Sequence, residues 1–380
     1  MASSIKRESK SKEKGANRSK EADSMEGKMK AVVLHGPGEY SVDMVDIPKP
    51  ERGEVLVKIM GVAICGSDPR LFSGGSRNNG WPPEYPFVLG HEFAGEVVEL
   101  GEGVTKFKIG DRVAGEAHCG CGTCEMCMKG YYNLCLNYGV KGSGHHHYGH
   151  NTRGCYAQYR NYDVKALTTL PASLSYDEGT MADTAGTAYN AIKLTGIEPG
   201  GYTVVIGPGP MGLMAMEIAK SMGSRTIMVG RGHRLEVAKQ LGADYTVDFE
   251  KIEDPVAEVK RITEGFGAHQ VIECAGNETA FYEAVQMARK NGHVAFISIP
   301  SEDGQKIAIK SLVMNQITLH GVRANPNCSK TVLSLMEQGA INVKDMITHT
   351  FPIDDVKEAF DTFINRKDGA VKVVVHPNEA

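Results

Sequence analysis

The chain has 380 residues, of which 41% are hydrophobic and 23% charged, and its formal net charge is −4. This composition excludes a mostly disordered chain, a coiled coil and a collagen-like repeat, and the length predicts two or three domains. No apolar run approaches ~18 residues, so we expect no membrane span, and the near-neutral charge argues against a nucleic-acid-binding surface.

The first 29 residues differ in composition from the rest of the chain. Segment 1–29 is rich in Lys, Glu and Ser and has few large apolar side chains, which predicts a disordered tail. It lacks the apolar stretch of a secretory signal, and its acidic residues fit a transit peptide poorly. A basic docking arm is the alternative interpretation.

Ordered structure is predicted to begin at Lys30. The runs AVVL, EVLVKIMGVAI, FAGEVVEL and DRVAG are short and β-rich, which is typical of an all-β, barrel-like region. From about Asp177, six strand-like runs alternate with helical runs, the pattern of a doubly wound parallel sheet. One of these helical runs, TAFYEAVQMARKNG, is predicted to continue to Gly292. After Ala324 come two helical runs and a final strand, AVKVVVHP. We therefore predict an α/β protein.

A glycine-rich turn follows the first strand of the predicted parallel sheet and opens the next helix. Its residues are Gly207, Pro208, Gly209, Pro210, Met211 and Gly212. Gly207 permits a tight turn, Gly209 lets a diphosphate approach the backbone, and Gly212 lets the helix pack on the strand. The free N–H groups of the helix N-terminus attract phosphate. The motif predicts a dinucleotide site, and a purely structural turn is the alternative.

The end of the second strand bears on which dinucleotide is bound. An acidic residue about 20 residues after the glycine turn would hold the ribose hydroxyls of NAD. This strand ends instead in Gly230 and Arg231, with Arg234 close behind. Arginine pairs with a 2′-phosphate, which a carboxylate would repel. We expect NADP to be favoured over NAD, with stacking of Arg231 on the adenine as the alternative.

Most of the nine cysteines fall between Cys119 and Cys155, which indicates thiolate–metal chemistry in a reducing compartment. Four of them have the spacing of a closed, tetrahedral structural zinc site. These four are Cys121, Cys124, Cys127 and Cys135. Disulfides are the alternative, and Cys119 and Cys155 are expected to be free thiols.

A second candidate metal set is dispersed along the chain. Cys65 lies in GVAICGSD, His91 and Glu92 in LGHEFAGEV, and Asp183 in MADTAGTAYNA. A cysteine, a histidine and a carboxylate can leave one zinc position open for water or substrate, as catalytic sites do. Spacing alone supports this set weakly, because an isolated His-Glu pair is more often a surface feature.

Together these segments resemble the zinc-dependent medium-chain dehydrogenases/reductases, the family of alcohol, polyol and threonine dehydrogenases. The matching segments are GVAICGSD, GHEFAGEVVELGEGVTKFKIGDRV, the four-cysteine lobe, GPGPMG and DDVKEAFD, and the resemblance runs from Lys30 to Pro377. It implies a GroES-like β-barrel catalytic domain at 30–184 with a zinc lobe at 119–136. A Rossmann domain at 185–324 and a return to the catalytic domain at 325–380 would follow.

The resemblance also implies two zinc ions per chain, one structural and one catalytic. The ligands of the catalytic zinc would be Cys65, His91 and Asp183. Glu92 would lie beside the ion as a neighbour or occasional ligand, Asp68 would orient His91, and Ser67 would take the proton of the substrate hydroxyl. Zinc would act as a Lewis acid while hydride passes to the nicotinamide.

One position departs from the family pattern. Many relatives carry a histidine of the proton relay five residues after the zinc cysteine, where this chain has Arg70, which cannot act as an ordinary acid or base. The relay is then expected to use water, a ribose hydroxyl or another histidine.

The run from His145 to His150 (HHHYGH) is either an exposed loop or stray metal-binding tract, or it serves the substrate or the relay. Arg70, Arg77 and this run are candidates for holding an anionic or heavily hydroxylated substrate.

The predicted activity is reversible oxidation of a polyol or secondary alcohol to a ketone or aldehyde. A threonine-type amino-alcohol dehydrogenase is the alternative within the enzyme class. Outside it, the alternatives are a non-catalytic NADPH-binding protein and a nucleic-acid-binding zinc ribbon, but the lobe CGCGTCEMCMKGYYNLC is near neutral. We expect a small-molecule substrate, no nucleic-acid or membrane partner, a homodimer or homotetramer, and a cytoplasmic location.

Overall fold

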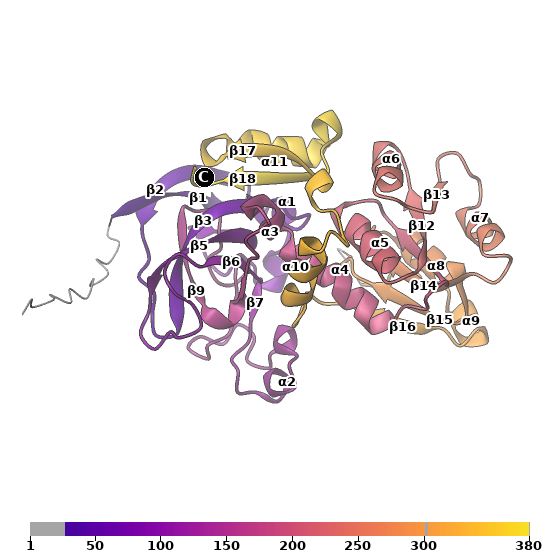
Figure 1. The fold of residues 1–380 in the computed structure, drawn as a ribbon, viewed down its shortest axis with the longest axis horizontal. Helices are drawn as coiled ribbons and strands as arrows, with labels where there is room; N and C mark the ends of the chain where they lie inside the picture. The colour runs from indigo at the N-terminus through magenta and orange to yellow at the C-terminus, as the bar shows by residue number, and fades with distance from the viewer. Residues whose placement is uncertain (1–26, 301–302, 380) are drawn as a thin grey trace, which may run out of the picture.

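The computed structural model describes residues 27–300 and 303–379, which form a β-rich region and a parallel-sheet region side by side (Figure 1). Strand β1 (Lys28–Gly36) begins before the predicted start at Lys30, because Lys28 pairs with Asp46 of β2 (Glu39–Asp46). An ion pair of 2.7 Å between Lys28 Nζ and Asp46 Oδ1 closes this end of the hairpin. Met29 of the predicted tail also lies in β1, and residues 1–26 lie outside the described residues.

The predicted all-β region is confirmed and contains two main sheets. A three-stranded antiparallel sheet has the order β2-β1-β4, and a seven-stranded sheet has the order β10-β6-β5-β3-β18-β17, with β9 also paired to β3. Strands β7 and β8 form a small pair next to the cysteine lobe. The bounds are β3 (Glu54–Ala63), β4 (Phe87–Val88), β5 (Glu92–Leu100), β6 (Arg112–Gly115), β7 (His118–Cys119), β8 (His146–His147), β9 (Tyr159–Asp163), β10 (Leu167–Thr169), β17 (Ile347–Pro352) and β18 (Lys372–His376).

The C-terminal strands β17 and β18 complete the larger sheet. Strand β18 pairs antiparallel with β3, where Val374 lies opposite Ala63. Helix α11 (Val356–Asn365) runs beside these strands on the β-rich region (Figure 1, yellow). Its buried residues Val356, Ala359 and Phe360 have the i, i+3, i+4 spacing of an apolar helix face, which explains why the helix packs there.

The predicted doubly wound sheet is also confirmed. Its six strands are all parallel and have the order β13-β12-β11-β14-β15-β16. All five residues of β11 are buried, as expected for a parallel strand covered on both faces. The order reverses between β11 and β14, and ligands of such sheets bind at the carboxyl ends of the strands at this point. The bounds are β11 (Tyr202–Ile206), β12 (Arg225–Gly230), β13 (Tyr245–Asp248), β14 (Ala268–Glu273), β15 (Ala288–Phe296) and β16 (Thr318–Gly321).

One predicted helix is shorter than expected. Helix α8 ends at Met287 rather than Gly292, because Ala288 already pairs with Ala268 of β14 and starts β15. The α-helices are α1 (Asp68–Phe72), α2 (Glu125–Met128), α3 (Tyr176–Thr180), α4 (Ala182–Thr195), α5 (Pro210–Ser221), α6 (His233–Gln240), α7 (Pro255–Ile262), α8 (Glu278–Met287), α9 (Ile309–Met314), α10 (Ser329–Glu337) and α11. Short 3-10 turns are η1 (Arg77–Asn79), η2 (Tyr132–Leu134), η3 (Val164–Ala166), η4 (Lys344–Met346), η5 (Ile353–Asp355) and η6 (Lys367–Gly369).

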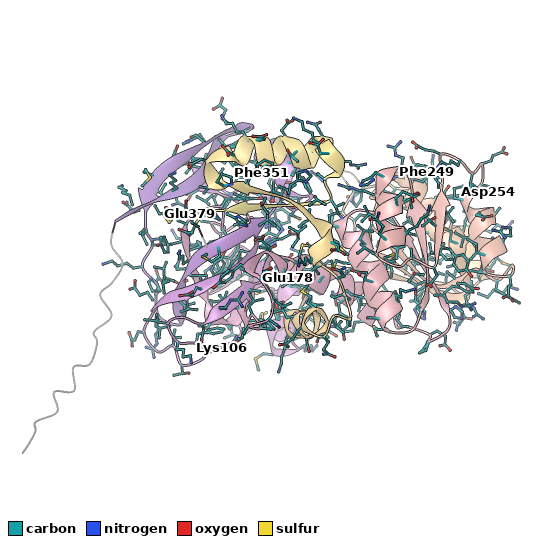
Figure 2. All side chains as sticks on the ribbon, turned by 45° about the horizontal axis from the view of Figure 1, so that its top comes forward. Lys106, Glu178, Phe249, Asp254, Phe351 and Glu379 are labelled. Atoms are coloured by element: carbon teal, nitrogen blue, oxygen red, sulfur yellow. The ribbon has the colours of Figure 1, made fainter. Side chains whose placement is uncertain are left out.

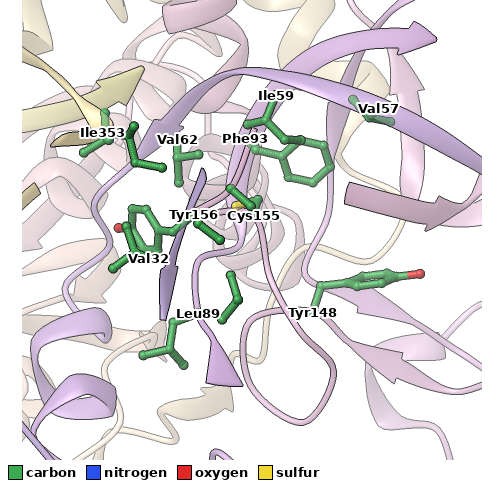
Figure 3. Close-up of a cluster of buried hydrophobic side chains, with 14 of the residues drawn as sticks. Val32, Val57, Ile59, Val62, Leu89, Phe93, Tyr148, Cys155, Tyr156 and Ile353 are labelled. Atoms are coloured by element: carbon green, nitrogen blue, oxygen red, sulfur yellow. The ribbon is translucent and has the colours of Figure 1, made fainter. Parts of the chain in front are cut away.

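A buried aromatic and aliphatic cluster holds the β-rich region together (Figure 3). The rings of Phe93 and Tyr162 stack with centroids 4.2 Å apart, which joins β5 to β9. Tyr156 and Tyr148 are also buried in this cluster. The packing fixes the strands that carry the candidate metal ligands. Within the ranges 27–300 and 303–379, we find no helix with the length and apolar character needed to cross a membrane.

Candidate active site

Four cysteine side chains meet in the lobe between β7 and β8. The Sγ atoms of Cys121, Cys124, Cys127 and Cys135 lie within 4.8 Å of one another. The Cys121–Cys127 and Cys124–Cys135 separations are 3.9 Å, close to the ~3.8 Å edge of a tetrahedron with Zn–S bonds of ~2.3 Å. The structure has no disulfide at any of the nine cysteines. The predicted set is therefore brought together in a form that fits a four-thiolate zinc site.

The four thiols of the lobe differ in acidity: hydrogen bonds lower the pKa of Cys121 and Cys124, whereas burial raises the pKa of Cys127 to about 12 and also raises that of Cys135. Backbone N–H groups of Thr123 and Cys124 donate to Cys121 Sγ, each at 3.4 Å. Hydrogen bonds from Thr123 are the main cause that lowers the pKa of Cys121 to about 5. Burial also raises the pKa of Cys119 to about 12 and that of Cys155 well above its ordinary value. Those two thiols lie outside the metal-binding set, as predicted for free thiols.

A second donor set forms where β3 and β5 pair. Ala63 at the end of β3 lies opposite Glu92, the first residue of β5, so the following Cys65 comes close to His91 and Glu92. Donor atoms of Cys65, His91 and Glu92 lie within 4.8 Å of one another. Asp183 does not join this set: it lies in the first turn of α4 and accepts a hydrogen bond from the N–H of Ala117 at 3.3 Å.

His91 is surrounded by anionic groups. Burial lowers its pKa, but Cys65, Asp68 and Asp183 outweigh this effect and raise the pKa to about 10. Burial raises the pKa of Asp183 to about 6. An excess of negative charge around a buried imidazole is the condition that a divalent cation would neutralise. The residues present therefore fit a zinc ion.

Asp68 lies beside both Cys65 and His91, and Ser67 directly precedes it. Asp68 accepts hydrogen bonds from the Cys65 N–H at 2.9 Å and the Tyr156 hydroxyl at 2.8 Å. Its other oxygen lies 3.7 Å from His91 Nδ1. The Ser67 hydroxyl is buried and has no hydrogen-bond partner among the described residues. Its hydrogen-bonding capacity is therefore unused by the other described residues.

The two arginines considered for substrate binding instead contact residues of their own loop. Arg70 Nε donates to the Gly75 carbonyl at 3.1 Å. Arg77 donates to the Pro82 carbonyl and lies over the Tyr85 ring, 5.2 Å from its centroid. Both side chains thus stabilise the insert between Cys65 and His91.

The histidine run is not an exposed loop. His145, His147 and His150 are at most 7% exposed, and His146 is half-buried. The burial follows from ring stacking: His147 stacks on His150 at 3.8 Å, and the ring of His150 lies 4.8 Å from that of His91. The exposed alternative is therefore wrong.

His118 is a member of this stack that sequence reasoning missed. Its ring stacks on His147 at 4.0 Å, and the edges of both His147 and His150 meet Trp81 of the insert. The Tyr138 hydroxyl forms a 2.5 Å hydrogen bond with His147 Nδ1. No local pattern marks His118, because it joins the stack through the pairing of β7 with β8.

The glycine-rich turn stands at the carboxyl end of β11, where the sheet order reverses. Gly207 has φ +101°, a conformation that L side chains rarely adopt, and a Cβ on Gly212 would lie 2.0 Å from the Gly207 carbonyl oxygen. Gly209 caps α5, and Pro210 and Met211 are its first residues. A cavity of about 670 Å³ opens here, lined also by Gly230, Arg231 and Arg234. Sequence reasoning missed further lining residues, namely Cys274, Ala275, Asn277 and Thr279.

Gly230 has a packing role that the sequence did not reveal. A Cβ at this position would lie 2.3 Å from Pro208 Cδ, so the proline of the glycine-rich turn excludes any larger residue. The absence of an acid at Gly230 therefore has a steric cause as well as the electrostatic one considered above.

Arg231 is restrained beside the cavity. Its Nη1 forms an ion pair of 2.8 Å with Glu250, and the guanidinium lies 5.8 Å from the centroid of Phe249. Phe249 lies on the parallel-sheet region in Figure 2. Arg234 Nη2 donates to the Ala370 carbonyl at 2.9 Å. Both predicted arginines thus line the cavity.

The parallel sheet with its glycine-rich turn, and the two sets of metal-binding side chains, define a metal-dependent oxidoreductase of the dinucleotide-binding type. Comparison with known proteins agrees. Residues 51–172 match the family described as "Alcohol dehydrogenase GroES-like domain", and residues 210–338 match "Zinc-binding dehydrogenase". The chain belongs to the zinc-dependent medium-chain dehydrogenase/reductase family and is an enzyme that acts on CH–OH groups.

Individual relatives cover nearly the whole chain. Sorbitol dehydrogenase of Bacillus subtilis is 32% identical over 92% of this chain and 98% of its own length. L-threonine 3-dehydrogenase of Bacillus licheniformis is 33% identical over 93% of this chain and 100% of its own. A zinc-binding dehydrogenase from Sinorhizobium meliloti, solved bound to NADP, superposes with a TM-score of 0.83 at 29% identity and covers 92% of this chain and 100% of its own.

Proposed function

We propose that the chain is a zinc-dependent dehydrogenase of polyols or secondary alcohols. The observation that carries this proposal is the convergence of Cys65, His91 and a carboxylate beside the unpartnered hydroxyl of Ser67. Catalytic zinc sites with a cysteine, a histidine and a carboxylate resemble the polyol and secondary-alcohol branches, and a sorbitol dehydrogenase is among the relatives. An L-threonine 3-dehydrogenase is also among them, so threonine-type amino alcohols remain the second candidate.

We infer two zinc sites in each chain. The four-cysteine lobe would hold the structural ion. At the catalytic site the proximity of donors favours Cys65, His91 and Glu92, with Asp183 as the alternative carboxylate. Zinc supplies Lewis acidity toward the alcohol oxygen when bound, and the nicotinamide accepts the hydride. Asp68 orients the His91 ring. Ser67 Oγ accepts the hydroxyl proton of the substrate while it passes its own proton on through water, a ribose hydroxyl or another histidine.

For the cofactor we propose NADP in preference to NAD. Arg231 and Arg234 border the cavity, and no acid follows β12 directly. The paired strands β3 and β18 support a catalytic domain at 30–184 and 325–380 and a dinucleotide domain at 185–324. Free cysteines throughout favour a cytoplasmic enzyme, and we propose a homodimer or homotetramer.

The test combines metal analysis with a substrate screen. Purified protein should contain two zinc ions per chain and should reduce NADP with a polyol or secondary alcohol faster than with L-threonine. Cys65→Ala should lose one zinc ion and all but a few per cent of turnover while still binding the dinucleotide, because the glycine-rich turn lies in the other region. Full activity of Cys65→Ala, or threonine as the best substrate, would refute the proposal.

A further inference from the structure

Two guanidinium groups approach the dinucleotide cavity from different parts of the chain. Arg234 belongs to α6, directly after β12, whereas Arg366 follows α11 in the segment that returns to the β-rich region. Both line the cavity of about 670 Å³ that contains Gly207 and Gly209. Arg366 has left-handed backbone angles (φ 53°, ψ 38°), which end α11 and turn the chain toward α6.

The guanidinium of Arg234 is held next to the phosphate-binding turn. Nη2 donates to the carbonyl of Ala370, four residues after Arg366, at 2.9 Å. Nη1 lies 3.8 Å from the point that a Cβ on Gly209 would occupy. Nε is buried and has no hydrogen-bond partner among the described residues. The side chain is thus oriented across the turn with hydrogen-bonding capacity to spare.

The two cations are close to each other and lack an acidic partner. The proximity of Arg366, together with burial as the larger cause, lowers the pKa of Arg234 to about 10. In the part of the chain that the structure describes, neither arginine forms an ion pair, whereas Arg231 pairs with Glu250 and Lys367 with Asp361. Glu253 and Glu283 line the same cavity without pairing to either guanidinium. Arg366 is exposed, so water screens part of the repulsion between the two guanidinium groups, and an anion between them would be attracted by both.

We propose that Arg366, together with Arg234, binds a phosphate group of the dinucleotide, so that the cofactor joins the two regions of the chain. This inference rests on the proposed function, since it takes the cavity to be the cofactor site. The phosphate has two sources: the diphosphate common to NAD and NADP, and the 2′-phosphate that only NADP carries. A pair of guanidinium groups can bind either phosphate, because each guanidinium offers two parallel N–H donors to one anion.

The experiment compares NADH and NADPH binding, followed by nicotinamide fluorescence, in the zinc-loaded wild type, Arg366→Gln and Lys367→Gln. Lys367→Gln is the matched control, because it removes the neighbouring positive charge, which is paired with Asp361. We expect Arg366→Gln to weaken NADPH binding about ten-fold and Lys367→Gln to change it less than about two-fold. Arg366→Lys should recover part of the loss.

The two cofactors identify the phosphate. An equal loss for NADH and NADPH assigns Arg366 to the diphosphate, and a loss for NADPH alone assigns it to the 2′-phosphate. If Arg366→Gln binds both cofactors as tightly as Lys367→Gln does, the inference is overturned while the proposed function stands. If the wild type binds neither cofactor, the proposed function itself fails.

Discussion

Glu92 and Lys372 form an ion pair in which each side chain is only 2% exposed. Glu92 starts β5 directly after His91, and Lys372 starts β18 near the other end of the chain. Burial raises the pKa of Glu92, but Lys372, His91 and the Thr184 hydroxyl outweigh burial and keep the pKa below its ordinary value. The carboxylate next to Cys65 therefore stays charged, and Lys372 is the group that makes this possible.

Lys372→Met should destabilise the zinc-free protein far more than the zinc-loaded one. Without zinc, the variant leaves the Glu92 carboxylate buried and uncompensated, at a cost of about 3–5 kcal/mol. Zinc bound with Glu92 as a ligand would replace the missing charge. The measurement is the unfolding temperature with EDTA and with excess zinc.

Lys220→Met provides the control for this experiment, because it breaks a partly exposed pair with Asp244 and should cost less than about 1 kcal/mol in both states. An equal loss for Lys372→Met with and without zinc would exclude Glu92 as a ligand and return the role to Asp183.

Cys124→Ser should remove the structural zinc and leave the catalytic one. One thiolate is lost from a closed four-sulfur set whose metal binding is coupled to local folding, so the zinc content should fall from two to one and the unfolding temperature should drop. Cys119→Ser, which changes a buried thiol outside the set, should keep both ions. A Cys124→Ser protein with two zinc ions and an unchanged unfolding temperature would show that the lobe is not this site.

Arg231→Gln should lower kcat/KM for NADP about ten-fold and leave the value for NAD nearly unchanged, because a charge-assisted contact to the 2′-phosphate is lost. Glu250→Gln should act in the opposite direction, since it releases Arg231 from its 2.8 Å ion pair. Gly230→Asp is a poor test, because its Cβ would collide with Pro208. A wild-type enzyme that prefers NAD would contradict this prediction.

The buried histidine stack should make stability depend on pH. Burial is the main cause that lowers the pKa of His118 to about 3. The unfolded imidazole binds a proton near pH 6.5, so the unfolded state takes up more protons than the folded state, and stability is lost as the pH falls below about 6.5.

His118→Phe keeps a stacked ring but removes this titration. The loss of unfolding free energy from pH 6.5 to 5.5 should be smaller than in the wild type by about 1 kcal/mol. Urea unfolding at the two pH values measures it, with His35→Phe, an exposed position on β1, as the control. Parallel pH curves for His118→Phe and the wild type would mean that His118 is not held neutral in the folded state.

The elements of the parallel sheet were predictable because their signals are local. An apolar run, a Gly207–Gly212 turn and a helix follow one another within a few residues, and the cysteine spacing of the lobe is equally compact. The end of α8 was not predictable in this way. Helical periodicity continues past Met287, but Ala288 pairs with Ala268 of β14 and therefore belongs to a strand.

By itself, the sequence determined the family, the four-cysteine lobe and the dinucleotide turn, because the lobe and the turn depend on residue types at short, characteristic spacings. Only the tertiary structure decided which carboxylate lies with Cys65 and His91, that His118 joins the histidine stack, and that Arg366 lines the cavity at the glycine-rich turn. These relationships join residues far apart in the chain, as Glu92 and Lys372 are at a separation of 280 positions. The position of Glu92 beside Cys65 and Lys372 arises from the register of β3 with β5 and β18, and that of His118 from the pairing of β7 with β8. Side-chain packing across the sheets sets these registers, and no local pattern encodes them.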